Sequence, residues 1–281
     1  MAKTLISTTI ALIGFAANSV ICRLALEGGS MDASSFTAVR LFAGALTLVV
    51  ILSARNGFKL KLGKGRWTSA LMLFTYAATF SFAYDYLEAG LGALVLFAAV
   101  QTSMIFYDYF MGNRLTKLEW GGLFCAFSGI VVLVLPGITA PPLLGVFLMA
   151  IAGCAWGFYT LMGKVSKNNF SDTTGNFVKS LPFATVLLLA GIFNGSLSLY
   201  GVVLAIISGG LTTGVIYVVW YVALDGLTIV QSAVVQLLVP LIAAFGGVLF
   251  LSETVTARLV VSCLMILSGI LSVILLKKKN V

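Results

Sequence analysis

Histidine is missing from the sequence, and charged residues are scarce. None of the 281 residues is His, and Asp, Glu, Lys and Arg together make up 9% of them. A Ser-His hydrolase and a His-ligated metal site are therefore excluded. The motifs H-E-x-x-H, G-x-S-x-G and the P-loop are missing as well. We expect no enzyme, no metal, no cofactor and no nucleotide-driven pump.

Cysteine is also rare. The four cysteines, Cys22, Cys125, Cys154 and Cys263, show no spacing typical of metal ligands. All of them lie in apolar runs, so we expect them to pack inside helices.

Apolar residues dominate the chain instead. They make up 60% of it, and the mean hydropathy is +1.10, which is typical of a membrane protein. Long Leu, Val, Ala and Gly runs without strict alternation favour helices over barrel strands. A span needs about 20 apolar residues, which predicts an all-α membrane protein with ten transmembrane helices. The predicted ranges are 4–26, 33–53, 67–86, 89–110, 117–135, 142–163, 173–193, 200–222, 228–250 and 256–276.

The basic residues predict the orientation, because Lys and Arg near span ends stay on the cytoplasmic side. With the amino terminus inside, inner segments hold thirteen of the 17 basic residues. These are Lys3, Arg55, Lys59, Lys61, Lys64, Arg66, Arg114, Lys117, Lys164, Lys167, Lys277, Lys278 and Lys279. Both termini are therefore expected in the cytoplasm of a cell with an inner membrane. The net charge of +8 then reflects topology, and no nucleic-acid surface is expected.

The first apolar run is longer than a usual signal-peptide core. We interpret it as a retained helix, with cleavage after Ala17 as a minor alternative.

The two halves of the chain match at an offset of 140 residues. "FSGIVVLVL" (127–135) aligns with "LSGILSVIL" (267–275), "GALVLFAAV" (92–100) aligns with "SAVVQLLVP" (232–240), and Asp85 aligns with Asp225. Five helices per unit is an odd number, so the second unit must enter the membrane from the opposite side. This predicts two inverted five-helix repeats, 1–137 and 138–281, with a site between them near the membrane midplane, as in transporters. Asp85 and Asp225 would lie on opposite sides, which disfavours a paired-aspartate protease.

Several motifs resemble one known family. They are the Arg of "AVRLFAGAL", the Trp-Gly of "CAWGFYTLMGK", and the Pro and Glu that frame "PLIAAFGGVLFLSE". With the five-plus-five plan, they make the whole chain similar to the EamA family of the drug/metabolite transporter superfamily. The resemblance implies a central cavity built by both halves and export of amino acids or related small metabolites. The first half departs from the second, with Val100 opposite Pro240 and Asn113 opposite Glu253.

Arg40 places a charge inside a predicted span, with Lys179 as its counterpart in the second half. An Arg at the centre of a span costs about 2.5 to 3.5 kcal/mol on insertion scales, so it needs a partner or water. Arg40 could snorkel to the outer surface or brace a neighbouring helix. Alternatively, it could lie near the cavity and meet a carboxylate of the substrate, of Asp85 or of Glu88. The same alternatives hold for Lys179.

Other residues inside the spans are candidates for substrate binding. The polar ones are Asn18, Gln101 and Gln236, which could equally be interhelical hydrogen-bonding groups. The aromatic ones are Tyr76, Phe80, Trp156, Tyr159, Tyr217 and Trp220, which could instead belong to the core or to an interfacial belt. Trp156 and Trp220 are the stronger candidates because they lie well inside their spans. Rings and a cation together would suit a zwitterionic or anionic organic molecule.

Small residues and one proline have simpler expected roles. Gly153 with Gly157, and Gly210 with Gly214, form G-x-x-x-G pairs that let helices approach closely. Pro240 removes one backbone hydrogen bond and could kink its helix.

Ion coupling is the least defined feature. Without His, the titratable candidates for proton coupling are Asp108, Asp85 and Glu88, all near span ends where ordinary solvated carboxylates are common. Exchange and uniport stay open beside proton antiport. The sequence thus predicts a secondary or facilitative carrier that works by alternating access and whose partners are a small molecule and the lipid bilayer. Export as the direction is implied by the family resemblance alone. A non-transporting scaffold or sensor and a passive channel are the alternatives.

Overall fold

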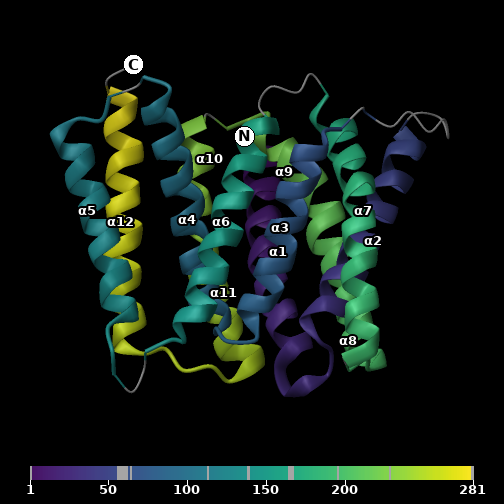
Figure 1. The fold of residues 1–281 in the computed structure, drawn as a ribbon. Helices are drawn as coiled ribbons and strands as arrows, with labels where there is room; N and C mark the ends of the chain where they lie inside the picture. Colours follow the sequence, from purple (N-terminus) through teal and green to yellow (C-terminus); the bar gives the residue numbers. More distant parts are fainter. Residues whose placement is uncertain are drawn as a thin grey trace.

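The computed structural model describes residues 2–55, 63, 65–112, 114–137, 140–163, 168–194, 196–227 and 229–279. Within these residues the regular structure is helical, apart from one isolated bridge between Met31 and Leu197. The helices form a bundle in which most axes run roughly parallel or antiparallel (Figure 1).

The first half of the chain contributes five long helices. They are α1 (Ala2–Leu26), α2 (Ala33–Arg55), α3 (Trp67–Tyr84), α4 (Ala89–Phe110) and α5 (Lys117–Val134), with a 3-10 turn, η1 (Glu27–Gly29), after α1. The second half contributes α6 (Leu143–Gly163), α7 (Asn169–Asn194), α8 (Leu199–Ile207), η2 (Ser208–Val215), α9 (Ile216–Leu224), α10 (Ile229–Gln236), α11 (Val239–Leu251) and α12 (Ala257–Lys279). The start of α1 and the end of α12 lie at the same end of the bundle, here called the terminal end (Figure 1). The opposite end, where α5 ends and α6 begins, is called the far end.

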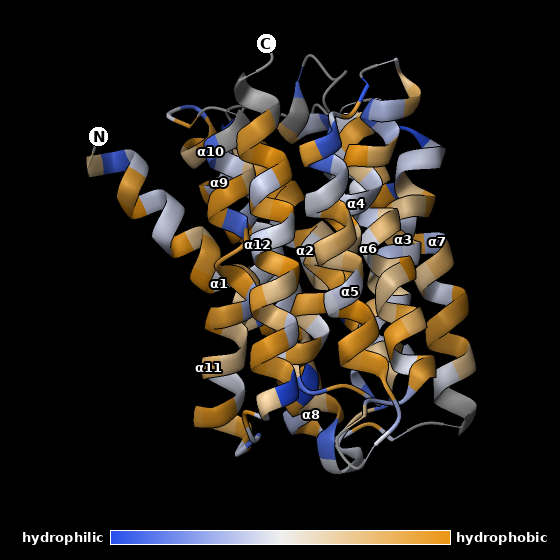
Figure 2. Ribbon diagram, turned by 90° about the vertical axis from the view of Figure 1, so that its left-hand side faces the viewer, coloured by the Kyte–Doolittle hydropathy of each residue, from blue (hydrophilic) through white to orange (hydrophobic). Residues whose placement is uncertain are grey.

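Hydrophobic residues predominate along the length of the bundle, and hydrophilic residues gather toward its two ends (Figure 2). Large apolar side chains such as Phe124 (76% exposed) and Leu199 (82% exposed) face outward. Among the described residues, eight helical stretches are long and apolar enough to cross a membrane. The chain is therefore a multi-pass membrane protein.

Two of the predicted spans, α3 and α7, are not among these eight stretches. Helix α3 carries polar side chains along much of its length, and α7 opens with Ser171, Asp172, Thr173 and Thr174. The structure begins α7 at Asn169, four residues before the predicted start at 173. Polar side chains in a membrane helix are tolerated where they face protein or water, and both helices contribute such residues to the central cavity.

The predicted helix 200–222 is divided. A π-helical stretch, η2, separates α8 from α9 and contains Gly209, Gly210 and Gly214. At Gly209 a Cβ would collide with the carbonyl oxygen of Arg40 on α2. The glycines therefore let two helix backbones touch, and the π-helical stretch carries Thr212 and Thr213, which line the central cavity.

The predicted helix 228–250 is also divided, and Pro240 explains the break. Pro240 sits in the first turn of α11 and has no N–H to give to the carbonyl of Gln236. Helix α10 ends at that residue.

The predicted G-x-x-x-G pairs do bring helices close together. A Cβ on Gly153 would lie 2.5 Å from the Cβ of Ala99 on α4, and Gly157 lies against Ser103 of the same helix. Gly210 and Gly214 both face Thr47 of α2. Of these close-packed helices, α4, α6 and η2 contribute to the wall of the cavity described next.

Candidate functional site

A cavity of about 720 Å³ lies inside the bundle. Its wall takes residues from α1, α3 and α4 of the first half and from α6, α7, η2, α9 and α10 of the second. The lining residues run from Asn18 and Val100, near mid-helix, to Arg66 and Gly163 at the terminal end. The cavity therefore extends from the middle of the bundle toward one end only.

Nine aromatic residues contribute to the cavity wall. They are Phe15, Tyr76, Phe80, Phe97, Trp156, Tyr159, Tyr217, Trp220 and Tyr221. Trp156 on α6 is the centre of one cluster: its ring stacks on Tyr159 at 5.4 Å and packs against Tyr76 of α3 at 4.8 Å and Tyr217 of α9 at 5.5 Å. Three helices from both halves thus fix the Trp156 ring by mutual packing.

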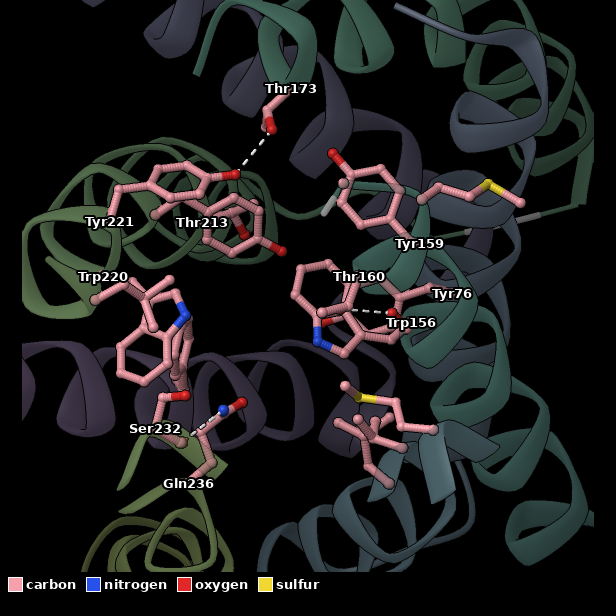
Figure 3. A pocket seen from close by; sticks show the side chains of 18 of the residues that line it. Tyr76, Trp156, Tyr159, Thr160, Thr173, Thr213, Trp220, Tyr221, Ser232 and Gln236 are labelled. Atoms are coloured by element: carbon pink, nitrogen blue, oxygen red, sulfur yellow. Dashed lines mark hydrogen bonds between the residues drawn. The ribbon is translucent and has the colours of Figure 1, made fainter. Parts of the chain in front are cut away.

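A second aromatic wall faces the first one. The ring of Trp220 meets Phe15 of α1 edge-on at 5.6 Å, and Phe15 also contacts Tyr217 at 6.3 Å. Figure 3 shows Trp156 and Trp220 on opposite sides of an open space. An apolar or aromatic group between them would bury both ring faces.

Polar groups are placed between these walls at a few points. The hydroxyl of Tyr221 lies 2.9 Å from that of Thr173, and the Gln236 amide donates to the carbonyl of Ser232 at 2.8 Å (Figure 3). The Oδ1 atom of Asn18 accepts hydrogen bonds from Ser208 (2.7 Å) and Thr212 (3.0 Å). Asn18 therefore anchors η2 to α1 and lines the cavity at the same time.

The buried hydroxyl of Tyr159 lies toward Thr173 and Asn176. It makes no hydrogen bond of normal geometry with any described residue. Buried hydroxyls rarely stay unsatisfied, so this one is a potential contact for a polar group in the cavity.

Nine of the eleven binding residues predicted from the sequence line this cavity. They are Asn18, Tyr76, Phe80, Gln101, Trp156, Tyr159, Tyr217, Trp220 and Gln236. The prediction omitted Phe15, the η2 threonines, and Asp172, Thr173 and Asn176 of α7. The polar run "SDTTGN" in the sequence could have indicated the α7 residues.

Arg40 lies behind the wall of the cavity and is 3% exposed, so it does not reach the surface. Its Nη2 donates to the carbonyl of Ala77 at 2.9 Å. Its guanidinium carbon lies 4.9 Å from the centre of the Phe80 ring and 5.8 Å from that of Tyr76. The alternative of an ion pair with Asp85 or Glu88 does not hold. Those carboxyls lie at the far end, and none of the nine Asp and Glu residues, all of them described, pairs with Arg40.

Lys179 also lies outside the cavity lining. Its amine donates to the carbonyl of Gly65 at 3.2 Å and lies 5.5 Å from the centre of the Trp67 ring. It thus braces the start of α3 beside the cavity mouth.

The three predicted coupling residues do not line the cavity either. Asp108 is half-buried near the terminal end of α4, while Asp85 and Glu88 lie between α3 and α4 at the far end. The side chain of Asp85 is exposed, but partial desolvation of its carboxyl raises the pKa to about 6, Arg23 opposes this shift, and nearby Asp32 adds to it. Burial also raises the pKa of Glu88, and the positive charge of Arg23 again opposes the shift.

A hydrogen-bonded cluster closes the far end. Both carboxylate oxygens of Glu253 lie 2.9 Å from the backbone nitrogen of Ala89 at the start of α4. Arg23 lies 3.8 Å from the same carboxylate and donates to the carbonyl of Tyr84 at 2.8 Å. The Arg23, Tyr84, Ala89 and Glu253 cluster, called the far-end latch, joins α1, α3 and α4 to the link between α11 and α12. None of its residues lines the cavity.

Comparisons with known proteins agree with this architecture. The EamA-like transporter family matches residues 2–135 and again residues 143–275. An uncharacterized protein of Pseudomonas aeruginosa is 46% identical over 270 residues, which cover 95% of this chain and 93% of that protein. An uncharacterized transporter of Bacillus subtilis is 23% identical over 84% of this chain and 85% of its own length, and one of Archaeoglobus fulgidus is 26% identical over 67% and 69%. A solved structure titled only as a crystal structure of a protein shares the fold, with a TM-score of 0.63, 18% identity, and coverage of 96% of this chain and 97% of the other.

Proposed function

The chain belongs to the EamA-like transporter family, and from this membership we propose that it is a secondary or facilitative carrier for a small organic metabolite. The proposed substrate is an amino acid or a related zwitterion or anion. The proposed mechanism is alternating access in a cell inner membrane, with both termini in the cytoplasm and export as the direction.

One observation carries this proposal: the central cavity is built from both halves of the chain. Its volume, about 720 Å³, falls within the range of roughly 300 to 1,000 Å³ of small-molecule sites. Its wall combines aromatic and aliphatic residues with polar side chains that could orient a small organic molecule. A site between two halves that move against each other is the arrangement used by transporters with internal repeats.

The proposal includes ten membrane crossings in two inverted repeats, 1–137 and 138–281. Helix α1 starts at the terminal end and α6 starts at the far end, as inversion requires (Figure 1). Asp85 follows the last residue of α3 and its repeat equivalent Asp225 follows the last residue of α9, at opposite ends of the bundle. Phe80 and its equivalent Trp220 both line the cavity. These matched positions support the repeat.

The conformation also supports alternating access. The cavity reaches the terminal end, while the latch of Arg23, Glu253 and their partners holds the helices together at the far end. With the termini in the cytoplasm, this is an inward-facing state. Transport would require this latch to open while the terminal end closes.

For coupling, the observations favour Asp85 among the three candidate carboxyls. A pKa of about 6 would let it gain and lose a proton near neutral pH, and it lies beside Arg23 of the latch. Protonation of Asp85 would then remove a negative charge from the far end while the far-end latch opens. Exchange of two metabolites or uniport would instead leave flux independent of a pH gradient.

The test is flux into proteoliposomes that contain the purified full chain. A thermal-shift screen of amino acids, nucleosides, amines and organic acids first selects a ligand, because a compound that binds only the folded state raises the apparent stability. Trp156→Ala should then abolish uptake of that ligand, whereas Trp120→Ala, a lipid-facing Trp on α5 (45% exposed), should not. Equal loss in both variants, or flux that persists after the far end is cross-linked to stop movement, would reject an alternating-access carrier and favour a channel or a scaffold.

A further inference from the structure

Arg40 is a buried positive charge without an anionic partner. All nine acidic residues of the chain are described, and none lies within ion-pair distance of it. The guanidinium makes one hydrogen bond, from Nη2 to Ala77, and its Nη1 atom has no hydrogen-bond partner. A desolvated charge is costly unless it is paired and hydrogen-bonded, so this site is energetically incomplete.

Three aromatic rings surround the guanidinium and compensate part of that cost. Its central carbon lies 4.9 Å from the ring centre of Phe80, 5.7 Å from that of Phe36 and 5.8 Å from that of Tyr76. Such cation–π contacts favour a cation, but a ring accepts no ordinary hydrogen bond from the free N–H groups of Nη1. The arrangement therefore holds the charge in place and leaves its donors available.

A small side chamber of about 10 Å³ lies directly against Arg40. Its wall also includes Leu73 and Ala77 of α3 and Phe177 of α7. Two further wall residues, Tyr76 and Thr213, line the main cavity as well. A single layer of side chains thus separates the unsatisfied guanidinium from the space assigned to the substrate.

We infer that this side chamber is the anion subsite of the carrier and that it accepts a carboxylate of the substrate. The inference rests on the proposed function and narrows its substrate class to organic anions and zwitterions with an apolar or aromatic body. The body would lie between Trp156 and Trp220, and the carboxylate would pass between Tyr76 and Thr213 to accept from Nη1. A cationic amine in the same place would be repelled.

The size of the chamber requires a movement of its wall. A volume near 10 Å³ holds about one water molecule, which is too little for a carboxylate. Tyr76 is half-buried and packs on Trp156 at 4.8 Å, so rotation of its side chain would enlarge the chamber and change the packing of Trp156. Carboxylate binding is thereby coupled to the aromatic wall of the main cavity.

The test compares acids with their neutral amides. The probes are 3-phenylpropionate with 3-phenylpropionamide and valerate with valeramide, measured by calorimetric titration of the purified full chain. The acid of at least one pair should bind, and Arg40→Gln should weaken its affinity by about tenfold or more, because a hydrogen bond to a charged group contributes about that much. Binding of the amides should be weak and unaffected by the substitution.

A matched control lies on the same helix. Arg55 at the end of α2 also stands over a ring, 5.3 Å from the centre of Phe170, but it is exposed and outside both cavities. Arg55→Gln should leave the affinity for the acid unchanged, and Arg40→Lys should restore part of it. A purely structural role of Arg40 would instead lower the affinity for acid and amide alike.

A second variant keeps the test decisive if Arg40→Gln does not fold. Leu73→Phe fills the chamber without removing the charge and without touching the main cavity. It should also weaken binding of the acid, and unchanged acid binding in a folded Leu73→Phe protein would overturn the inference.

Failure of the inference and failure of the proposed function give different results. If an amine or a neutral compound is transported in a Trp156-dependent way while no acid binds, the anion subsite is wrong and the carrier stands. If no compound is bound or transported by the folded protein, both are wrong.

Discussion

The carboxylate of Glu253 accepts a hydrogen bond from the backbone N–H of Ala89, a residue 164 positions earlier in the chain. Both carboxylate oxygens lie 2.9 Å from the nitrogen. This contact places an acidic side chain from the link between α11 and α12 on the amino terminus of α4. A carboxylate there satisfies a free N–H and interacts favourably with the helix dipole. It thus ties the second half of the chain to the first at the end where the cavity is closed.

Removal of this carboxylate should loosen the far end. Glu253→Ala leaves the Ala89 N–H without its partner and Arg23 without its ion pair, and we expect a loss of about 1 kcal/mol in the free energy of unfolding. In a background where Cys125, Cys154 and Cys263 are replaced by Ala, maleimide should label the buried Cys22 of α1 faster than in the protein that retains Glu253. Glu27→Ala, which removes an exposed acid from the same end, should leave the labelling rate unchanged. Equal rates in all three proteins would show that Glu253 does not hold this end closed.

The raised pKa of Asp85 predicts a pH dependence of stability. A carboxyl whose pKa is higher in the folded protein than its ordinary value of 3.8 binds more protons when folded, so stability should fall as the pH rises from about 4 to about 6. Asp85→Asn should therefore stabilise the protein at pH 7 and have little effect at pH 4, as measured by the difference in Tm across this range. Asp225→Asn, the repeat equivalent at the other end, serves as the matched control for loss of the acid itself. A Tm difference that does not change with pH would argue against the assignment.

Asn18 should matter for stability as well as for binding. Asn18→Ala removes the acceptor of Ser208 and Thr212, and two buried hydroxyls that lose a partner should cost about 1 to 3 kcal/mol. The denaturation midpoint in a mild detergent measures this loss. In a double-mutant cycle, Asn18→Ala and Thr212→Val remove the same hydrogen bond. The stability losses of the two single variants should therefore sum to more than the loss measured in the double variant. Strict additivity would indicate that the Asn18 oxygen does not hold η2.

Gly209 should be the least replaceable glycine of the π-helical stretch. A Cβ there would collide with the Arg40 carbonyl, and neither backbone can move without separating α2 from η2. We expect Gly209→Ala to cost about 2 kcal/mol or more and to weaken ligand binding through Arg40. Gly121→Ala on α5 is the matched control, because a Cβ at Gly121 meets nothing within 4 Å and Ala is the better helix former. A small effect at Gly209 would mean that the close approach is not required.

Much of the helix pattern could be predicted from the sequence because lipid imposes long apolar segments between polar links. The bounds of α4, Ala89–Phe110, agree with the prediction, while α7 starts earlier because its polar first turn, with Asp172, resembles a loop. The break before Pro240 follows from a residue present in the sequence. The π turn at Ser208–Val215 does not, because it depends on how closely α2 approaches Gly209.

The site was predictable in part for a similar reason. Aromatic and amide side chains well inside a span have few stable positions other than a cavity or a helix contact, so Trp156, Gln101 and Gln236 could be identified from position alone. Arg40 could not be placed, because a guanidinium near the start of a helix has several equally reachable partners. Only the tertiary arrangement puts it behind Tyr76 and away from Asp85.

The break between α10 and α11 gives the two halves different mechanical properties. In the first half, Val100 lies in α4, one continuous helix of 22 residues. A displacement of its middle, which lines the cavity, would therefore move both ends of the helix. The corresponding segment of the second half is broken after Gln236 into α10 and α11, and α11 packs on α4. In the proposed alternating-access movement, the first half of the wall would therefore act as one rigid helix and the second half would bend at this break, so the two halves would contribute unequally. Most of the displacement around a bound molecule would then fall on the short helix that carries Ser232 and Gln236.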